Sequence, residues 1–293
     1  LGQSMKETEN PAVNHVHENA AKSGVAAILA KDSEEAIAKA KQLLSVLPAN
    51  NLETAGNDYY MENDAAVSAD LKGIELISSV ADKESVIELY KQFGTSAVTA
   101  IGSLNWRTAG FVATNNGAKL TADDSAKIAR FVTLCDAYSI PVVTFVDSEG
   151  FEKSSAAELA GSIRDSAKLA QAYASATTAK IAVVTGKAYG SAYVALASTA
   201  AGSDFTFAWE GAVIAPTTPE AAVVFLNGVS EDNAKQAQEY ADNEADAFTA
   251  AANGYVDRVI TAEDTKSALT SAIEATSSKR VVTPAKKHVN FVY

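Results

Sequence analysis

The sequence predicts an α/β protein built on a largely parallel sheet. Two apolar runs, IPVVTFVD at 140–147 and KIAVVT at 180–185, have the continuous β-branched composition of strands that are buried on both faces. The stretch between them, 154–179, has the composition and spacing of a long helix. Strands that are joined through such helices pair in parallel, which places this chain in the α/β class.

The other elements follow from local signals, taken in chain order. A helix is expected from Asp32 or Ser33, with Pro48 after its end, followed by an acidic linker over 49–70 and a second helix over 82–94 that ends at Gly94. Short strands at 96–101 and 110–114 flank a turn around Asn105 and Trp106. Further helices are expected at 121–139 (capped by Thr121), from about 191, and at 216–226, 231–252 and 263–277, and further strands at 204–209 and 213–215.

The composition excludes several classes of protein. The 293 residues are 47% hydrophobic and 20% charged, which is ordinary for a globular chain. A formal charge of −12 argues against a nucleic-acid partner. No apolar run reaches the roughly 18 residues of a membrane span, and no basic-then-apolar leader opens the chain, so we expect a cytoplasmic protein. Because the chain begins Leu1-Gly2 rather than with Met, we expect a processed chain or a fragment.

The candidates for metal binding and thiol chemistry are few. Cys135 is alone, which excludes a disulfide framework and a cysteine-based zinc site, and its apolar context FVTLCDAY predicts a buried, inert thiol. The three histidines, His15, His17 and His288, lie at the two ends of the chain without a carboxylate-rich ligand set. We therefore expect no metal.

Two strand-to-helix turns are the candidate ligand site, because ligands of parallel sheets gather at the carboxyl ends of strands. One turn is FVDSEGF at 145–151, where a strand ends at Asp147. The other is GKAYGSAYVA at 186–195, where small residues let a ligand approach the backbone. The first N–H groups of the following helix have no internal partner, and two of them aimed at one oxygen would form an oxyanion hole.

The residues alone leave alternatives open at these turns. Close helix–strand packing explains the small residues equally well, and Asp147 is either a base or a cap for its turn. A nucleophilic Ser191 with Lys187 as base is a separate possibility, although the turn is not G-x-S-x-G. Nucleotide hydrolysis is disfavoured because the chain has neither G-x-G-x-x-G after its first strand nor G-x-x-x-x-G-K-[ST].

Several stretches resemble one family, in the same order over almost the whole chain. FVTLCDAYSIPVVTFVDSEGF resembles F-x-x-x-C-D-x-F-x-I-P-L-x-x-F-V-D-T-P-G-F, and KIAVVTGKAYGSAYVAL resembles K-x-x-x-x-x-R-K-A-Y-G-G-A-Y-x-x-M. GSDFTFAW, LLSVLPANNLE, AAANGYVDRVI and the terminal KKHVNF match as well. The family is that of the carboxyltransferase subunits of biotin-dependent acyl-CoA carboxylases and the related acyl-CoA decarboxylases.

The resemblance implies a crotonase-like fold, a spiral of ββα units with C-terminal helices. It implies that residues 1–70 are the end of a preceding crotonase-like domain plus a linker, and that 71–293 form a domain of the carboxyltransferase C-terminal type. The implied reaction moves CO2 between biotin and an acyl-CoA of the acetyl-, propionyl-/methylmalonyl- or glutaconyl-CoA class. The implied partners are a biotin carboxyl carrier protein or domain, acyl-CoA, and either further copies in a homo-oligomer or a carboxyltransferase N-terminal half.

The resemblance also assigns roles to residues of the two turns. The backbone N–H groups of Ser191 and Ala192 would form an oxyanion hole for the enolate, with the Gly150-Phe151 turn facing them. The implied contacts to substrate or biotin come from Gly190, Tyr189, Tyr193, Val194 and Asp147.

The chain departs from the family pattern at these same turns. Ser191 stands where the pattern has a second Gly, and Ser148-Glu149 replace Thr-Pro. Glu149 and Glu152 bring negative charge toward a site for an anionic substrate, which costs affinity. A substrate other than the usual ones, a decarboxylase variant and a weakened site are thus all compatible with the sequence. Two other functions are compatible as well: a non-catalytic crotonase-fold scaffold, and a Ser/Lys hydrolase.

Overall fold

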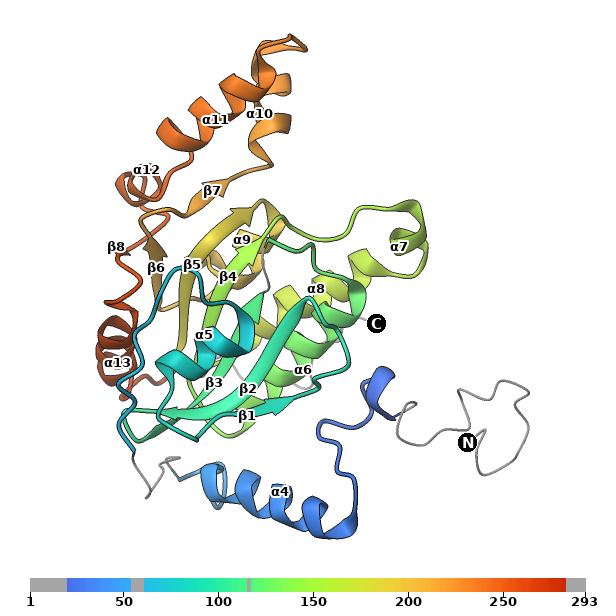
Figure 1. The fold of residues 1–293 in the computed structure, drawn as a ribbon, viewed down its shortest axis with the longest axis vertical. Coiled ribbons are helices and arrows are strands. Elements are labelled where there is room, and N and C mark those ends of the chain that lie inside the picture. Colours follow the sequence, from blue (N-terminus) through green and yellow to red (C-terminus); the bar gives the residue numbers. More distant parts are fainter. Residues whose placement is uncertain (1–19, 54–60, 115–116, 283–293) are drawn as a thin grey trace, which may run out of the picture.

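The computed structural model describes residues 20–53, 61–114 and 117–282. The strands of these residues form one eight-stranded sheet in the order β1-β2-β3-β4-β5-β6-β8, with β7 also paired to β5 (Figure 1). The first three strands are antiparallel, and every pair from β3 onward is parallel. The strands are β1 Ile87–Leu89, β2 Ala97–Leu104, β3 Arg107–Thr114, β4 Val142–Ser148, β5 Lys180–Tyr189, β6 Phe205–Trp209, β7 Val213–Ala215 and β8 Arg258–Ile260.

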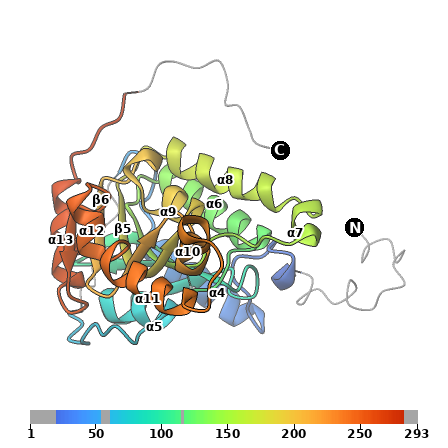
Figure 2. The same ribbon diagram turned by 90° about the horizontal axis from the view of Figure 1, so that it is seen from above.

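The helices cover both faces of the sheet, and α10 and α11 stand away from it as an arm (Figure 1). Figure 2 shows α6 and α8 on one side of the sheet and α5 on the other. The helices are α4 Ser33–Val46, α5 Gly73–Val80, α6 Ala122–Ala137, α7 Ser155–Leu159, α8 Ser162–Ser175, α9 Ser191–Leu196, α10 Pro219–Asn227, α11 Asn233–Asn243, α12 Ala247–Ala252 and α13 Thr265–Ala275.

The core lies in two layers, one on each face of the sheet. Along β4, Val142 and Val146 pack into the layer that includes α6 and α8, whereas Val143 and Phe145 pack into the layer that includes α5 and α13. Successive strand residues point to opposite faces, so a strand covered on both sides reads as a continuous apolar run. The α/β class predicted from such runs is confirmed.

Local sequence signals explain several element boundaries. Thr121 caps α6 in a capping box with Asp124, as its position predicted. The turn at Asn105 and Trp106 joins β2 to β3 with φ of 47° and 62°, the left-handed values that a tight hairpin between twisted strands requires. Asp32 caps α4 by accepting the Glu35 N–H at 2.8 Å.

The prediction of a helix over 82–94 is wrong. This segment holds β1, which pairs antiparallel with β2, and Gly94 follows a turn rather than capping a helix. Its apolar residues fit a helical period, but pairing with the neighbouring strand wins over local pattern. The helix α5 within 73–80 was not predicted, and neither was β8.

Two long predicted helices are each broken in two. Gly161, with φ of 99°, separates α7 from α8, and a Cβ at this position would lie 2.5 Å from Arg164 Nη2. Between α11 and α12, the Ala245 carbonyl accepts the Ile214 N–H of β7 at 2.8 Å. The chain leaves the helix there because it adds a bridge to the sheet edge.

The domain boundary near residue 70 stays a prediction. The end of α4 is tied to the sheet, since Thr108 Oγ1 donates to the Val46 carbonyl at 2.8 Å. His15, His17, His288 and the KKHVNF match lie outside the described residues. Among the helices of the described ranges, none combines the length and apolarity of a membrane span.

Lys127 of α6 is buried beneath β2, which makes stability depend on pH. Its Nζ donates to the carbonyls of Ala97 at 2.7 Å and Gly94 at 3.2 Å. Burial lowers its pKa to about 8, although the negative charges of Asp124 and Glu88 act to raise it. The unfolded chain, with an ordinary lysine pKa of 10.5, therefore binds more protons between these two values, and the free energy of unfolding rises with pH there.

We expect Lys127→Met to remove this rise, which is on the order of 2 kcal/mol. Urea unfolding of the wild-type protein and of Lys127→Met, each at pH 7.5 and pH 10, measures this rise in the free energy of unfolding. Lys235→Met, at an exposed lysine of α11, is the matched control and should keep the full rise. An equal rise in the Lys127→Met protein would contradict the lowered pKa.

Candidate functional site

The structure brings the two predicted turns together at the carboxyl ends of β4 and β5. These strands pair in parallel, so the turns that follow them leave the sheet at the same edge. Gly150 has φ of 110°, and a Cβ built on it would lie 3.7 Å from the Tyr189 carbonyl oxygen. The Gly150-Phe151 turn thus lies directly against the residue that precedes Gly190.

Gly190 makes the second turn in a conformation that favours glycine. Its φ of 54° and ψ of −124° match the first central position of a type II′ turn. Its N–H donates to the Ala215 carbonyl at 2.9 Å, and a Cβ would lie 2.9 Å from the Pro216 carbonyl oxygen. Both strain and space therefore require glycine, and the turn is fixed against the end of β7.

The N–H groups of Ser191 and Ala192 follow this turn as the first two of α9. They make no hydrogen bond to any described residue, and α9 has no side-chain cap. Ser191 is exposed, whereas Ala192 is fully buried, so of these two residues only Ser191 adds a side chain to the surface of the turn. Since α9 has only six residues, what it offers a ligand is these two N–H groups rather than a long helix dipole.

The other residues of the predicted site surround this turn. Val194, one position beyond the first turn of α9, is 54% exposed. Tyr189 is buried, which raises its pKa. Tyr193 donates its hydroxyl to the Tyr255 carbonyl at 2.6 Å, and burial raises its pKa to about 12. Both tyrosines are therefore neutral at physiological pH.

Asp147 lies behind the turns, 6% exposed, and both of its carboxylate oxygens are in use. Oδ1 accepts the Lys187 N–H at 2.9 Å, and Oδ2 accepts from Lys72 Nζ at 3.4 Å. The predicted contact of Asp147 with a substrate stays a prediction, and the structure favours the different role argued below. Lys72 precedes α5 and lies 75 residues from Asp147 in the chain, so no local sequence pattern predicted this contact.

The acidic residues that depart from the family pattern are partnered. Glu149 accepts from Lys187 Nζ at 2.6 Å, an interaction that raises the pKa of Lys187. Glu152 accepts from the Ser154 hydroxyl at 3.2 Å. The negative charge expected from Glu149 is thus matched by a lysine at the same site.

The structure gives no support to nucleophilic catalysis. Lys187, the candidate base for Ser191, is ion-paired with Glu149, and a raised pKa keeps it protonated. Ser191 Oγ has no hydrogen bond to a described residue. Cys135 is fully buried, as predicted, and burial raises its pKa, which disfavours the reactive thiolate.

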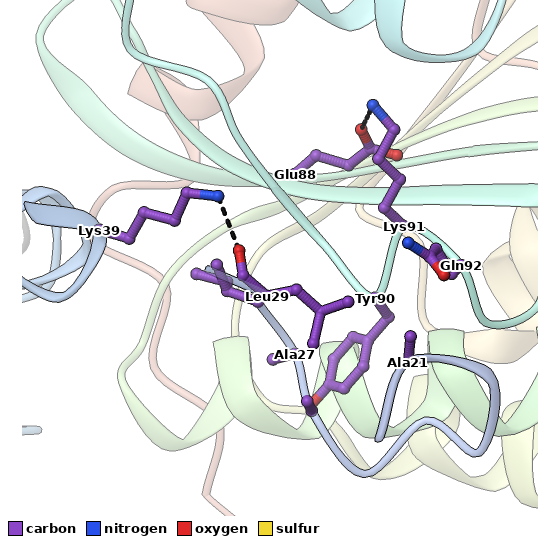
Figure 3. Close-up of a pocket in the computed structure, with 10 residues that line it drawn as sticks. Ala21, Ala27, Leu29, Lys39, Glu88, Tyr90, Lys91 and Gln92 are labelled. Atoms are coloured by element: carbon purple, nitrogen blue, oxygen red, sulfur yellow. Dashed lines mark hydrogen bonds and ion pairs between the residues drawn. The ribbon is translucent and has the colours of Figure 1, made fainter. Parts of the chain in front are cut away.

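Neither a cluster of metal ligands among the described residues nor the pocket beside β1 coincides with the two turns. The residues described include no group of three or more His, Cys, Asp or Glu side chains arranged to hold a metal. A shallow pocket of about 240 Å³ lies beside β1, lined by residues that include Ala27, Lys39, Tyr90 and Lys91 (Figure 3). It lies three strands from β4 in the sheet order and contains none of the predicted site residues.

Comparison with known proteins gives consistent results. The family described as Carboxyl transferase domain matches residues 4–291. The 12S subunit of methylmalonyl-CoA carboxyltransferase from Propionibacterium freudenreichii subsp. shermanii is 35% identical over 92% of this chain and 56% of its own length. The alpha subunit of methylmalonyl-CoA decarboxylase from Veillonella parvula is 33% identical, and the propionyl-CoA carboxylase beta chain of Cereibacter sphaeroides 34%, with the same coverages.

A solved structure of transcarboxylase 12S, with methylmalonyl-coenzyme A and methylmalonic acid bound, superposes with a TM-score of 0.88 at 34% identity. The match covers 100% of this chain and 61% of that one. The predicted crotonase-like fold is confirmed by this similarity. The chain spans about half the length of the curated relatives it matches. By the extent of these matches, the chain belongs to the carboxyl transferase domain family.

Proposed function

We propose that this chain forms the biotin side of a carboxyltransferase site, which moves a carboxyl group between biotin and an acyl-CoA. The observation that carries the proposal is the Gly190 turn, whose two following N–H groups are unpartnered beside the Gly150 turn. Acyl-CoA of the methylmalonyl/propionyl class is the substrate that the relatives' names support. The relatives include carboxylases, a carboxyltransferase and a decarboxylase, so their names support transfer of the carboxyl group in either direction.

The N–H groups of Ser191 and Ala192 would stabilise the negative oxygen of an acyl-CoA enolate. Donors fixed before the reaction act most strongly where charge develops, because no reorganisation is needed. Gly190 would aim these groups, and the lack of a side chain at Gly150 would let the ring of biotin approach this turn. Biotin, when bound, supplies the nitrogen that carries the carboxyl group.

The side chains around the turn would shape the site rather than react. Tyr189 and Tyr193 are neutral and buried or half-buried, so they form walls, and Val194 is exposed where an acyl chain or a biotin ring would pass. No step in this scheme uses a side-chain nucleophile. Ser191 acts through its backbone N–H.

Partners complete the site. Since the chain spans about half of its relatives, a carboxyltransferase N-terminal half would hold the acyl-CoA, and a biotin carrier protein or domain would deliver the biotin. The related transcarboxylase 12S assembles as a hexamer, which supports an oligomer here as well. A scaffold without catalysis is the alternative, and calorimetry with a biotinyl carrier domain separates the two, because a scaffold would not bind biotin at the turn.

The first prediction from the proposed function concerns the isolated chain. Residues 1–293 alone should show little or no transfer, because they lack the acyl-CoA half. Adding a carboxyltransferase N-terminal half and the biotin carrier should restore transfer, followed as carboxylation of propionyl-CoA or loss of carboxylate from methylmalonyl-CoA. Robust decarboxylation by the isolated chain would contradict this division of the site.

A second prediction tests the Gly190 turn in the assembled enzyme. Gly190→Ala should lower kcat roughly 100-fold, the effect of losing one oxyanion donor. The methyl group would press on the Pro216 carbonyl and turn the two N–H groups away. Gly211→Ala is the matched control, since a Cβ there meets nothing within 4 Å, and its kcat should be that of wild type. Equal kcat in the two variants would argue for a packing role of the turn.

A third prediction separates the backbone of Ser191 from its side chain. Ser191→Gly keeps the N–H and should preserve or raise kcat. Ser191→Pro removes the N–H at the first helical position, where proline is tolerated, and should lower kcat by about 10²-fold or more. If Ser191→Gly instead abolished transfer, the hydroxyl would be the active group.

A further inference from the structure

Strand β5 contains an irregularity at the point where Asp147 faces it. Val146 pairs with Val184 but Ser148 pairs with Ala188, so the single residue Asp147 of β4 lies opposite three residues of β5. The extra chain, Thr185–Lys187, forms a bulge immediately before the Tyr189-Gly190 turn. Bulges of this kind re-aim the chain and recur next to active sites.

The Asp147 carboxylate fills the gap in the ladder that the bulge creates. Its Oδ1 accepts the Lys187 N–H at 2.9 Å, in place of a β4 carbonyl. Gly186 lies against the carboxylate so closely that a Cβ would stand 2.5 Å from Oδ1 and 2.6 Å from Cγ. The bulge is thus built around this side chain.

The backbone of Asp147 ties a third segment to the same point. Its N–H donates to Thr114 Oγ1 at the end of β3, at 2.7 Å, and its carbonyl accepts the Gly117 N–H at 3.0 Å. Lys72 Nζ lies 3.4 Å from Oδ2 and balances the charge. Asp147 therefore joins the ends of β3 and β4 to the bulge of β5.

The opposite end of β5 provides a comparison within the same strand. Asp204 Oδ2 accepts the Lys180 N–H at 2.8 Å and pairs with Lys279 Nζ at 2.8 Å. This is the same combination of one strand N–H and one lysine, but at the amino end, away from both turns. A loss of Asp204 should cost stability without moving the Gly190 turn.

We propose that Asp147 is a positioning residue: its carboxylate holds the Thr185–Lys187 bulge and so sets the direction of the Ser191 and Ala192 N–H groups. This inference rests on the proposed role of those N–H groups. Asp147 acts neither as a base nor as a substrate ligand, because both of its oxygens are partnered within the fold. Its effect on the reaction passes through the backbone of β5.

Asparagine and alanine at position 147 separate these roles in the assembled enzyme. Asp147→Asn keeps an oxygen that accepts the Lys187 N–H and should retain most of kcat, whereas loss of a general base costs about 10²–10⁴-fold. Asp147→Ala removes the acceptor and should lower kcat by about 10²-fold, the cost of a misplaced catalytic group, with KM for acyl-CoA nearly unchanged. The pH profile of kcat should keep its shape in Asp147→Asn. If Asp147→Asn is as inactive as Asp147→Ala, the proposal is overturned.

Asp204→Ala is the matched control for the general loss of a strand contact. It should lower the melting temperature as Asp147→Ala does and keep the kcat of wild type. A loss of kcat in Asp204→Ala equal to that in Asp147→Ala would show that any weakening of β5 suffices, which would overturn a specific positioning role. So would a wild-type kcat in Asp147→Ala.

Gly186→Ala tests the same contact from the other side and does not depend on the folding of Asp147→Ala. The added methyl should displace the carboxylate and lower kcat. In the double variant Gly186→Ala/Asp147→Ala the two effects should be less than additive, because they act through one contact. Strict additivity would contradict the proposal.

Amide hydrogen exchange gives a readout that needs no transfer activity. The Lys187 N–H should exchange faster in Asp147→Ala than in wild type and in Asp147→Asn, and unchanged exchange would overturn the proposal. A wild-type assembly that transfers no carboxyl group would instead count against the proposed function, while the exchange result would still decide the role of Asp147 in holding the bulge.

Discussion

The parallel pairing of β4 with β5 is the constraint on which the rest of the structure depends. Both strands are buried between two helix layers, and their register from Val142 with Lys180 to Val146 with Val184 is regular. Because both faces of these strands are covered, their backbone reaches solvent only at the strand ends. What β4 and β5 themselves can offer a ligand is therefore concentrated in the turns beyond Ser148 and Tyr189.

The backbone N–H groups at the amino ends of the strands have different partners from those at the carboxyl end of β5. At the amino ends, carboxylates satisfy them: Asp136 accepts from Thr177 and Thr178, Asp204 from Lys180, and Asp257 from Thr206. At the carboxyl end of β5, the N–H groups of Ser191 and Ala192 have no partner among the described residues. Along β5, carboxylates satisfy the Lys180 N–H at the amino end and the Lys187 N–H at the bulge, whereas the two N–H groups that follow Gly190 have no partner among the described residues. Unpartnered donors at that one point are what a site for a developing anion requires.

Sequence patterns predicted those parts of the fold that depend on local information. The runs at 140–147 and 180–185 predicted the buried strands β4 and β5, and Thr121 predicted the start of α6, because composition and capping act within a few residues. The prediction of a helix over 82–94 failed because the residues that pair with this segment lie in β2, outside the segment itself. For the same reason, the bulge in β5 and the link from Lys72 to Asp147 could not be predicted, since each joins residues far apart in the chain.

Charge pairing offsets part of the negative charge at the two turns of this acidic chain. The formal charge is −12, yet two carboxylates at the turns each face a lysine: Asp147 faces Lys72, and Glu149 faces Lys187. The raised pKa of Lys187 keeps the second pair intact across neutral pH. With Asp147 and Glu149 each paired to a lysine, the contribution proposed for the Ser191 and Ala192 N–H groups depends on the direction in which they point, and the geometry of β5 decides that direction.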